Sequence, residues 1–373
     1  MAQSIFFYTD SREIAGAENA LFTLIEALDR QAWNPTLLLD AATGTEQLAK
    51  RGRALDIPVL FAPETPLGLK GARRVPALVR LLRRERPAVF HAHLTWPMAG
   101  KFPLAAAVAA RVPAVVATVQ LIPPVTSDRS NLLQLRLLAR RVGRFIAVSR
   151  DIATGLVDDF GWPADRIEVI HNAVEAGRFV APARASLRDL LTEGGDRAVV
   201  LVPARLNEQK GHSFLLRAAA QLPEAVFVLA GDGPIRDTLE AQAAELGVER
   251  RIRFLGYRSD IPQLLAASDL VALPSLYEGS SVAILEAMAA GRAVVASAIG
   301  GTDELIEDGK TGILVPPGEV DPLAAALRRL LDDPELRRSI ADAARRRVER
   351  DFNAAAMAGR VEKVYDRLLV RAL

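Results

Sequence analysis

The chain has 373 residues, half of them apolar and a quarter charged, which is an ordinary globular composition with room for two hydrophobic cores. It contains no cysteine, which excludes disulfide bonds, thiolate metal sites and a cysteine nucleophile and favours a reducing compartment. The net charge is only +2, and no nucleic-acid partner is expected.

The N-terminal segment does not have the pattern of a signal peptide. It lacks a basic start, and Asp10 and Arg12 interrupt it before an apolar run of the required length develops. The longest weakly polar stretch, residues 104–119, is broken by Arg111 and Pro113 and is shorter than the about 20 apolar residues that span a bilayer. We expect a cytoplasmic protein, with peripheral contact at the inner face of a membrane left open.

The first half of the chain alternates short apolar runs with helical segments. A strand is predicted at residues 4–8, and Leu21, Leu24 and Leu28 then recur at helical spacing. Further strands are predicted at residues 36–39, 59–61, 88–91, 114–119 and 144–148. Strands separated by helices predict a parallel sheet with right-handed crossovers.

Residues 66–144 form a basic region with fourteen Lys or Arg and two acidic residues, Glu85 and Asp128. Such a region attracts an anionic surface, such as a phospholipid membrane or a phosphorylated acceptor. Arginines such as Arg80, Arg83 and Arg84 are equally typical of the solvated face of a helix, so both interpretations stay open.

Residues 175–196 show no long periodic element and are interpreted as a linker. A second series of strands is predicted at residues 198–203, 226–230, 252–255, 270–273, 293–296 and 313–315. The fold class is therefore α/β, with two doubly wound, Rossmann-like domains whose facing strand ends leave a ligand-binding cleft. The first domain is expected at residues 1–175 and the second at 176–352, with the helical segment 353–373 packing back on the first.

The segment PSLYEGSSVAILEAMAAG, residues 274–291, passes from a strand through a turn into a helix. Ser280 or Ser281 is predicted to cap this helix, whose free N–H groups and dipole favour an anion such as a diphosphate. Glu286 lies about 7–8 Å along the helix axis, a spacing that lets Glu278 and Glu286 meet the sugar and ribose of a nucleotide sugar. The alternative is that Glu278 only caps the helix and Glu286 only lies on its surface, since two such acids would have the same spacing.

Six ordered motifs extend this pattern over nearly the whole C-terminal half: VIHNAVE, ARLNEQKGH, LAGDGP, FLGYRSDIPQLLAASDLVALPS, EGSSVAILE and IGGTDELIEDGKTGILVPPGE. Together they resemble the retaining GT-B glycosyltransferases, or glycosyl transferases group 1, which include phosphatidylinositol mannosyltransferases and lipopolysaccharide and exopolysaccharide enzymes. The resemblance implies the GT-B fold and a UDP- or GDP-sugar as donor substrate, with no cofactor. The sequence supplies no aspartate cluster for a divalent metal, so no bound metal is expected.

The resemblance also implies roles for individual residues. Arg205 and Lys210 match a basic pair that grips the donor diphosphate, as a forked cation and a point charge can do. Glu278 resembles the acid that contacts the transferred sugar, and Glu286 the acid that holds the ribose. Further residues implied in donor binding are Gly256, Tyr257 and Arg258 along the base, and Ser280, Ser281 and Val282 at the helix start.

The N-terminal half matches the same family more sparsely. SREIAGAENALFTLIEAL resembles its glycine-rich loop, with Ala15 in place of the first glycine and Gly16 and Ala17 still small enough for close backbone approach.

His91 and His93 share one face of a predicted strand. No neighbouring acid completes a metal site, and His93 matches a histidine that faces the transferred sugar in the family. A buried structural role for both histidines is the alternative. Gln120 stands where many relatives have histidine, so the acceptor is not assigned.

The function implied is transfer of a hexose-type sugar, with retention of anomeric configuration, to a glycan, a lipid-linked acceptor or a small molecule. A nucleotide-sugar 2-epimerase on the same scaffold is the closest alternative, and a non-catalytic sugar-nucleotide-binding protein is the alternative of a different class. A dinucleotide oxidoreductase is disfavoured because the run from Gly231 to Arg236 lacks the third glycine of the fingerprint.

Overall fold

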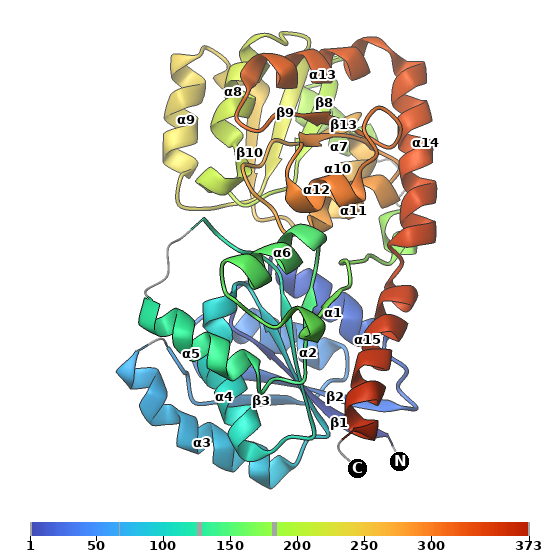
Figure 1. Cartoon of the computed structure of the whole chain (residues 1–373). Coiled ribbons are helices and arrows are strands. Elements are labelled where there is room, and N and C mark those ends of the chain that lie inside the picture. The colour runs from blue at the N-terminus through green and yellow to red at the C-terminus, as the bar shows by residue number, and fades with distance from the viewer. Residues whose placement is uncertain (1, 67, 125–128, 181–184, 372–373) are drawn as a thin grey trace. The chain divides into compact units, whose positions relative to one another are not determined.

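The computed structural model describes residues 2–66, 68–124, 129–180 and 185–371. The chain divides into two compact units, Met1–Asn172 with Ala354–Leu373, and Ala173–Asn353. Both are parallel α/β structures, which confirms the predicted fold class (Figure 1). No helix of the described ranges is both long and apolar enough to cross a bilayer.

The first unit is built on a seven-stranded sheet in the order β3-β2-β1-β4-β5-β6-β7. The strands are β1 (Gln3–Thr9), β2 (Trp33–Asp40), β3 (Val59–Ala62), β4 (Val89–Leu94), β5 (Ala114–Val119), β6 (Arg144–Ala147) and β7 (Ile167–Val169). The six strands predicted in this half are all present. Strand β7 was not predicted, because three half-buried residues at a sheet edge carry too little periodic signal.

Helices cover both faces of this sheet. They are α1 (Gly16–Ala27), α2 (Glu46–Ala54), α3 (Leu69–Glu85), α4 (Lys101–Ala110), α5 (Arg129–Ala139) and α6 (Arg150–Asp158). Leu82 of α3, Leu104 of α4 and Leu135 of α5 belong to one buried cluster with Phe90 of β4, so these helices share a face. A reversal of strand order after β3 moves the right-handed crossovers to that face.

The C-terminal helix α15 (Ala354–Val370) completes the first unit. Its Tyr365 is fully buried, meets the Trp33 ring edge-on at 5.3 Å and lies with its hydroxyl 2.6 Å from Nδ1 of His91. The helix also packs beside α1 and β5. The chain therefore returns to its starting unit after completing the second one.

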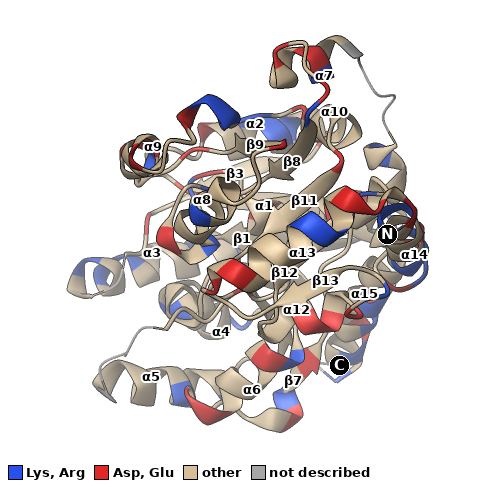
Figure 2. Cartoon of the chain, turned by 90° about the horizontal axis from the view of Figure 1, so that it is seen from above, with Lys and Arg blue, Asp and Glu red and all other residues tan. Residues whose placement is uncertain are grey.

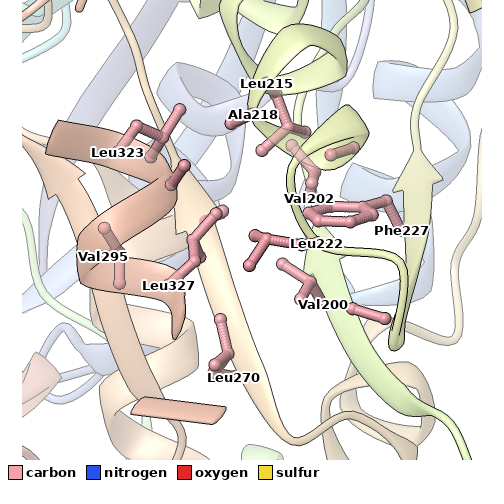
Figure 3. Packing of buried hydrophobic residues seen from close by; sticks show 14 of the residues in the cluster. Val200, Val202, Leu215, Ala218, Leu222, Phe227, Leu270, Val295, Leu323 and Leu327 are labelled. Carbon is pink, nitrogen blue, oxygen red and sulfur yellow. The ribbon is translucent and has the colours of Figure 1, made fainter. Parts of the chain in front are cut away.

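The second unit has a six-stranded sheet in the order β10-β9-β8-β11-β12-β13. Its strands are β8 (Ala198–Val202), β9 (Ala225–Ala230), β10 (Ile252–Gly256), β11 (Leu270–Leu273), β12 (Ala293–Ser297) and β13 (Ile313–Val315), all at predicted places. Figure 3 shows side chains of α8 and α13, such as Leu215 and Leu327, closing over Val200 and Phe227 of the sheet. Near-continuous apolar strands are typical of a parallel sheet covered on both faces.

The helices of this unit are α7 (Ala185–Thr192), α8 (His212–Ala220), α9 (Arg236–Glu245), α10 (Ile261–Ala267), α11 (Val282–Ala289), α12 (Gly300–Leu305), α13 (Val320–Asp332) and α14 (Pro334–Asp351). Helix α7 falls inside the predicted linker. It is held by tertiary contacts that the sequence pattern does not display: Leu191 is buried, and Arg188 donates to Asp269 at 2.9 Å and to the Ala267 carbonyl at 3.0 Å.

Two glycines allow loops at the carboxyl edge of this sheet to touch backbone to backbone. A Cβ added to Gly211 would lie 1.9 Å from the carbonyl oxygen of Pro274, and one added to Gly301 would lie 1.5 Å from that of Gly279. Gly211 also has a positive φ of 67°, which disfavours any side chain. The loop after β8 is thus seated directly on the loop after β11.

This contact predicts different costs for two glycine substitutions with the same backbone conformation. Gly291→Ala, at φ 64° with open space around it, is expected to lose about 1–2 kcal/mol from the left-handed backbone alone. Gly211→Ala should lose about 1–3 kcal/mol more, because its methyl group meets the Pro274 carbonyl. Urea unfolding followed by circular dichroism measures both, and equal losses would show that the loop contact imposes no constraint.

Candidate functional site

Two candidate residues from distant parts of the sequence meet at the carboxyl ends of β8 and β11. Lys210 ends a short 3₁₀ turn (Glu208–Lys210) after β8, and Glu278 follows β11. Their side chains form an ion pair, and Ser275 Oγ donates to the same Glu278 oxygen at 2.9 Å. The Lys210 side chain is 20% exposed and that of Glu278 only 9%. This is a partly desolvated pair, in which each charge depends on the other more than at an open surface.

Backbone contacts hold the two loops in register independently of this ion pair. The Leu276 amide donates to the Gln209 carbonyl at 2.7 Å, and the Gln209 side chain donates to the Tyr277 carbonyl at 2.9 Å. The residues that form these bonds directly precede Lys210 and Glu278 in the sequence. The position of the pair is therefore fixed by the main chain, so a ligand that displaces one side chain leaves the loops in place.

Helix α11 begins directly after this pair. Ser281 occupies its N-cap position, with extended backbone angles, but its hydroxyl accepts no hydrogen bond from the first turn. The predicted serine cap is therefore wrong in its hydrogen bond and right only in its position. Ser280, Ser281 and Val282 are all buried and follow Glu278 by two to four residues. The positive end of the helix dipole lies at this turn.

The other predicted donor residues of the second unit occupy the same end of its sheet. Arg205 is exposed, on the segment that leads from β8 to Lys210, and Glu286 is half-buried inside α11. Gly256 ends β10 with a φ of 66°, and Tyr257 beyond it is 61% exposed. Arg258 donates two hydrogen bonds to Asp260, at 2.7 and 2.6 Å, so the carboxylate compensates its charge. The backbone groups of residues 256–258 are therefore better suited than the Arg258 side chain to bind a ligand.

In the first unit, Gly16 and Ala17 form the first turn of α1. Ala15 has no polar side chain to cap this helix, but its amide donates to Glu18 Oε2 at 2.9 Å. Glu18 is 1% exposed, and burial raises the pKa of its carboxyl. Glu18 was not among the predicted site residues; its position three residues after the N-cap is the signal that identifies it.

His93 lies at the end of β4 with 5% exposure. Burial lowers the pKa of His93 to about 3, although a hydrogen bond with the backbone of Ala17 acts in the opposite direction. Its Nε2 lies 3.4 Å from Nε2 of Gln120. The structure therefore brings Ala17 and His93 together, and the ring is neutral near pH 7.

His91 has a buried structural role, which the sequence left as the alternative for both His91 and His93. It is fully buried, with Nδ1 at Tyr365 and Nε2 2.8 Å from the Thr118 hydroxyl, and burial lowers its pKa well below the usual value. In the second unit, burial and then the charge of Lys210 lower the pKa of His212 to about 4. Within the described part of the chain, no three metal-binding side chains of His, Cys, Asp or Glu come together.

Family comparisons account for both units. Residues 184–347 match the model for glycosyl transferases group 1, and residues 14–178 match that for glycosyltransferase family 4. The chain is 27% identical over 373 residues to the Escherichia coli UDP-Gal:alpha-D-GlcNAc-diphosphoundecaprenol alpha-1,3-galactosyltransferase, covering 96% of this chain and 95% of the relative. It is 42% identical over 153 residues to alpha-D-kanosaminyltransferase of Streptomyces kanamyceticus, covering 39% of this chain and 40% of that relative.

The chain spans about half the length of several curated relatives that it matches. For example, its match to the lipopolysaccharide core glycosyltransferase LpsE of Rhizobium meliloti covers 53% of that protein. Among solved structures, HepE of Anabaena in complex with UDP-glucose has a TM-score of 0.86 and 29% identity, over 98% of this chain and 99% of HepE. Two family models that cover both units, and a fold shared with HepE along the chain, show that this protein belongs to the GT-B glycosyltransferases.

Proposed function

We propose that this protein transfers a hexose-type sugar from a UDP-sugar to a glycan, lipid-linked or small-molecule acceptor, with retention of anomeric configuration. The observation that carries the proposal is the Lys210–Glu278 pair, held by the main chain beside the start of α11. Of the two nucleotides that the sequence left open, UDP is favoured because HepE has been solved with UDP and with UDP-glucose.

The ion pair suits a site that must accept a diphosphate. In the structure, Glu278 compensates the charge of Lys210. A diphosphate presents more negative charge than one carboxylate, so Lys210 turns to its oxygens and Glu278 is released to accept hydrogen bonds from sugar hydroxyls. Arg205 adds a forked cation, and the first-turn N–H groups of α11 add the helix dipole.

The remaining candidate residues have roles that follow from the family resemblance. Glu286 holds the ribose, and the backbone of residues 256–258 lies along the base. Gly16, Ala17 and His93 of the first unit serve the acceptor and the transferred sugar. A neutral His93 hydrogen-bonds a hydroxyl without placing a positive charge near a sugar ring that itself becomes positive.

Chemistry at this site is dominated by stabilisation of the leaving group. Breaking the anomeric bond builds negative charge on the diphosphate, which Arg205, Lys210 and the first-turn N–H groups of α11 stabilise in this proposal. In this proposal Glu278 binds the sugar hydroxyls and does not act as a nucleophile. We therefore propose attack from the face that the diphosphate leaves, with its oxygen taking the acceptor's proton.

Removing either cation tests the proposed donor site. Lys210→Ala and Arg205→Ala should each reduce transfer from a UDP-sugar by about 100-fold or more, the usual effect of losing one preorganised charge stabiliser. Lys310→Ala is the matched control, because the Lys310 side chain is 77% exposed and forms a surface ion pair with Glu307. Transfer is measured as UDP release with an acceptor panel.

Near-normal turnover in both variants would contradict this account. Incubation of the donor without acceptor separates the alternatives: a transferase gives slow hydrolysis at most, whereas an epimerase forms a new sugar nucleotide. A non-catalytic binding protein would bind the donor, raise its own melting temperature and release no UDP under either condition. The anomeric configuration of the product, read by NMR, tests retention.

Divalent metal is not required in the proposed mechanism, because Arg205, Lys210 and the α11 turn supply the positive charge that a metal would otherwise give. Transfer should therefore continue at an unchanged rate in excess EDTA. Loss of turnover on chelation, followed by recovery with magnesium, would assign leaving-group stabilisation to a metal instead. The measurement is the same UDP-release assay after dialysis against chelator.

We further propose that the first unit docks on an anionic membrane through α3 and α5. Helix α3 exposes Arg73, Arg80 and Arg83, and Figure 2 shows basic residues along its length. On α5, Leu133 and Leu137 are one turn apart and 58% and 55% exposed. Both helices pack against α4, and exposed leucines together with exposed basic residues are the combination that inserts into and is attracted by an anionic bilayer surface. Asp128 of the basic region lies outside the described residues.

Vesicle binding tests this surface. The protein should sediment with phosphatidylglycerol vesicles at low salt, much less at high salt, and not with phosphatidylcholine alone. Leu133→Ser with Leu137→Ser should weaken sedimentation, since it removes the inserting side chains. Leu190→Ser is the control, because Leu190 is 73% exposed on α7 of the other unit. Equal sedimentation of the α5 variant and the control would rule out this surface.

A further inference from the structure

Three buried polar side chains from different strand ends form one cluster in the first unit. His93 belongs to β4, Gln120 directly follows β5, and Asn172 lies three residues beyond β7; their exposures are 5%, 8% and 4%. Gln120 and Asn172 exchange two hydrogen bonds, Asn172 Nδ2 to Gln120 Oε1 at 2.8 Å and Gln120 Nε2 to Asn172 Oδ1 at 3.3 Å. A joint flip of both amides would preserve these bonds, so they hold the Gln120 side chain in place without selecting which end faces His93; in the structure that end is the amide nitrogen.

This orientation determines which nitrogen of His93 carries the proton. The atom of Gln120 that lies 3.4 Å from His93 Nε2 is its amide nitrogen, which can donate but cannot accept. Nε2 must therefore present its lone pair, so the proton of the neutral ring is on Nδ1. The hydrogen bond with the backbone of Ala17 favours the protonated form of the ring, as expected for a ring N–H that donates to a carbonyl.

His91 provides an internal contrast. Its ring nitrogens contact the hydroxyls of Tyr365 and Thr118, and a hydroxyl can donate or accept, so either tautomer of His91 is satisfied. His91 is also the titratable group whose ring faces His93, 5.9 Å away and edge-on. Thr118 and Asn172 line, with His93 and mostly apolar side chains, a small cavity beside the ring. No charged side chain is among the residues that line it.

We propose that Gln120, held in place by Asn172 and with its amide nitrogen toward the ring, is a positioning residue that locks His93 in the neutral Nδ1–H tautomer. The catalytic meaning of this lock rests on the proposed function, in which a neutral His93 avoids opposing the positive charge of the reacting sugar. It also explains the departure from the family pattern at this position. Histidine titrates near neutral pH, whereas glutamine offers a donor that does not change with pH.

Nitrogen NMR of the intact protein tests the tautomer without any assay of transfer. The chain contains four histidines, so ¹⁵N-histidine labelling gives few signals, and single His→Gln variants assign them. In the native protein, Nδ1 of His93 should appear as a protonated, pyrrole-type nitrogen and Nε2 as an unprotonated, pyridine-type nitrogen. Neither signal should shift between pH 5.5 and pH 8.5, a range that brackets the ordinary histidine pKa of about 6.5.

Two substitutions should then change this pattern in defined ways. Gln120→Glu replaces the donor with a carboxylate, so Nε2 should become the protonated nitrogen and the ring should titrate at a higher pH. Asn172→Ala releases the Gln120 amide, so two tautomers should average. Gln134→Glu makes the same chemical change at an exposed position of α5 and should leave the His93 signals unchanged. Circular dichroism confirms that each variant is folded.

The outcomes separate this inference from the proposed function. A native His93 with its proton on Nε2, or unchanged signals in folded Gln120→Glu, would overturn the lock even if the enzyme transfers sugar. The expected NMR pattern in a protein that transfers no sugar would leave the lock standing and remove the proposed function. When both hold, Gln120→Glu should lower kcat by about 10-fold, or ~1.4 kcal/mol, and make kcat depend on pH where the native value does not.

Discussion

The close approach of the loops after β8 and β11 is the constraint on which the proposed donor site depends. The two strands are neighbours in a parallel sheet, so their carboxyl ends leave the sheet side by side. Gly211 lets the first loop rest on the Pro274 carbonyl, and the Gln209 backbone and side chain bind the second loop. Lys210 and Glu278, 68 positions apart, are thereby set against each other at the edge of the sheet.

The two units use opposite electrostatic arrangements. In the second unit, a cation and an anion compensate each other in a partly buried position, which leaves both able to exchange partners when a charged ligand arrives. In the first unit, burial keeps His91 and His93 neutral, and amides and hydroxyls satisfy their rings. A charged region suits a diphosphate, and a neutral one suits the hydroxyl groups of an acceptor and a sugar.

The C-terminal helix has a direct connection to the candidate residues of the first unit. Tyr365 of α15 contacts His91, whose ring faces His93 from the same strand. The last helix of the chain thus supports the interior of the first domain, next to residues encoded more than 270 positions earlier. A solvent-exposed tail could not do this, because the buried histidine would lose its partner at Nδ1.

The sequence by itself determined the fold class, the places of twelve of the thirteen strands and the family, because apolar runs, loop glycines and ordered motifs are local signals. It did not determine β7 or α7, which are too short to stand out and depend on burial by other elements. The Lys210–Glu278 pair and the amide pair at His93 were decided only by the tertiary structure. Each joins groups whose partner is set by three-dimensional packing, and neither residue type nor spacing encodes which polar atom a buried side chain will face.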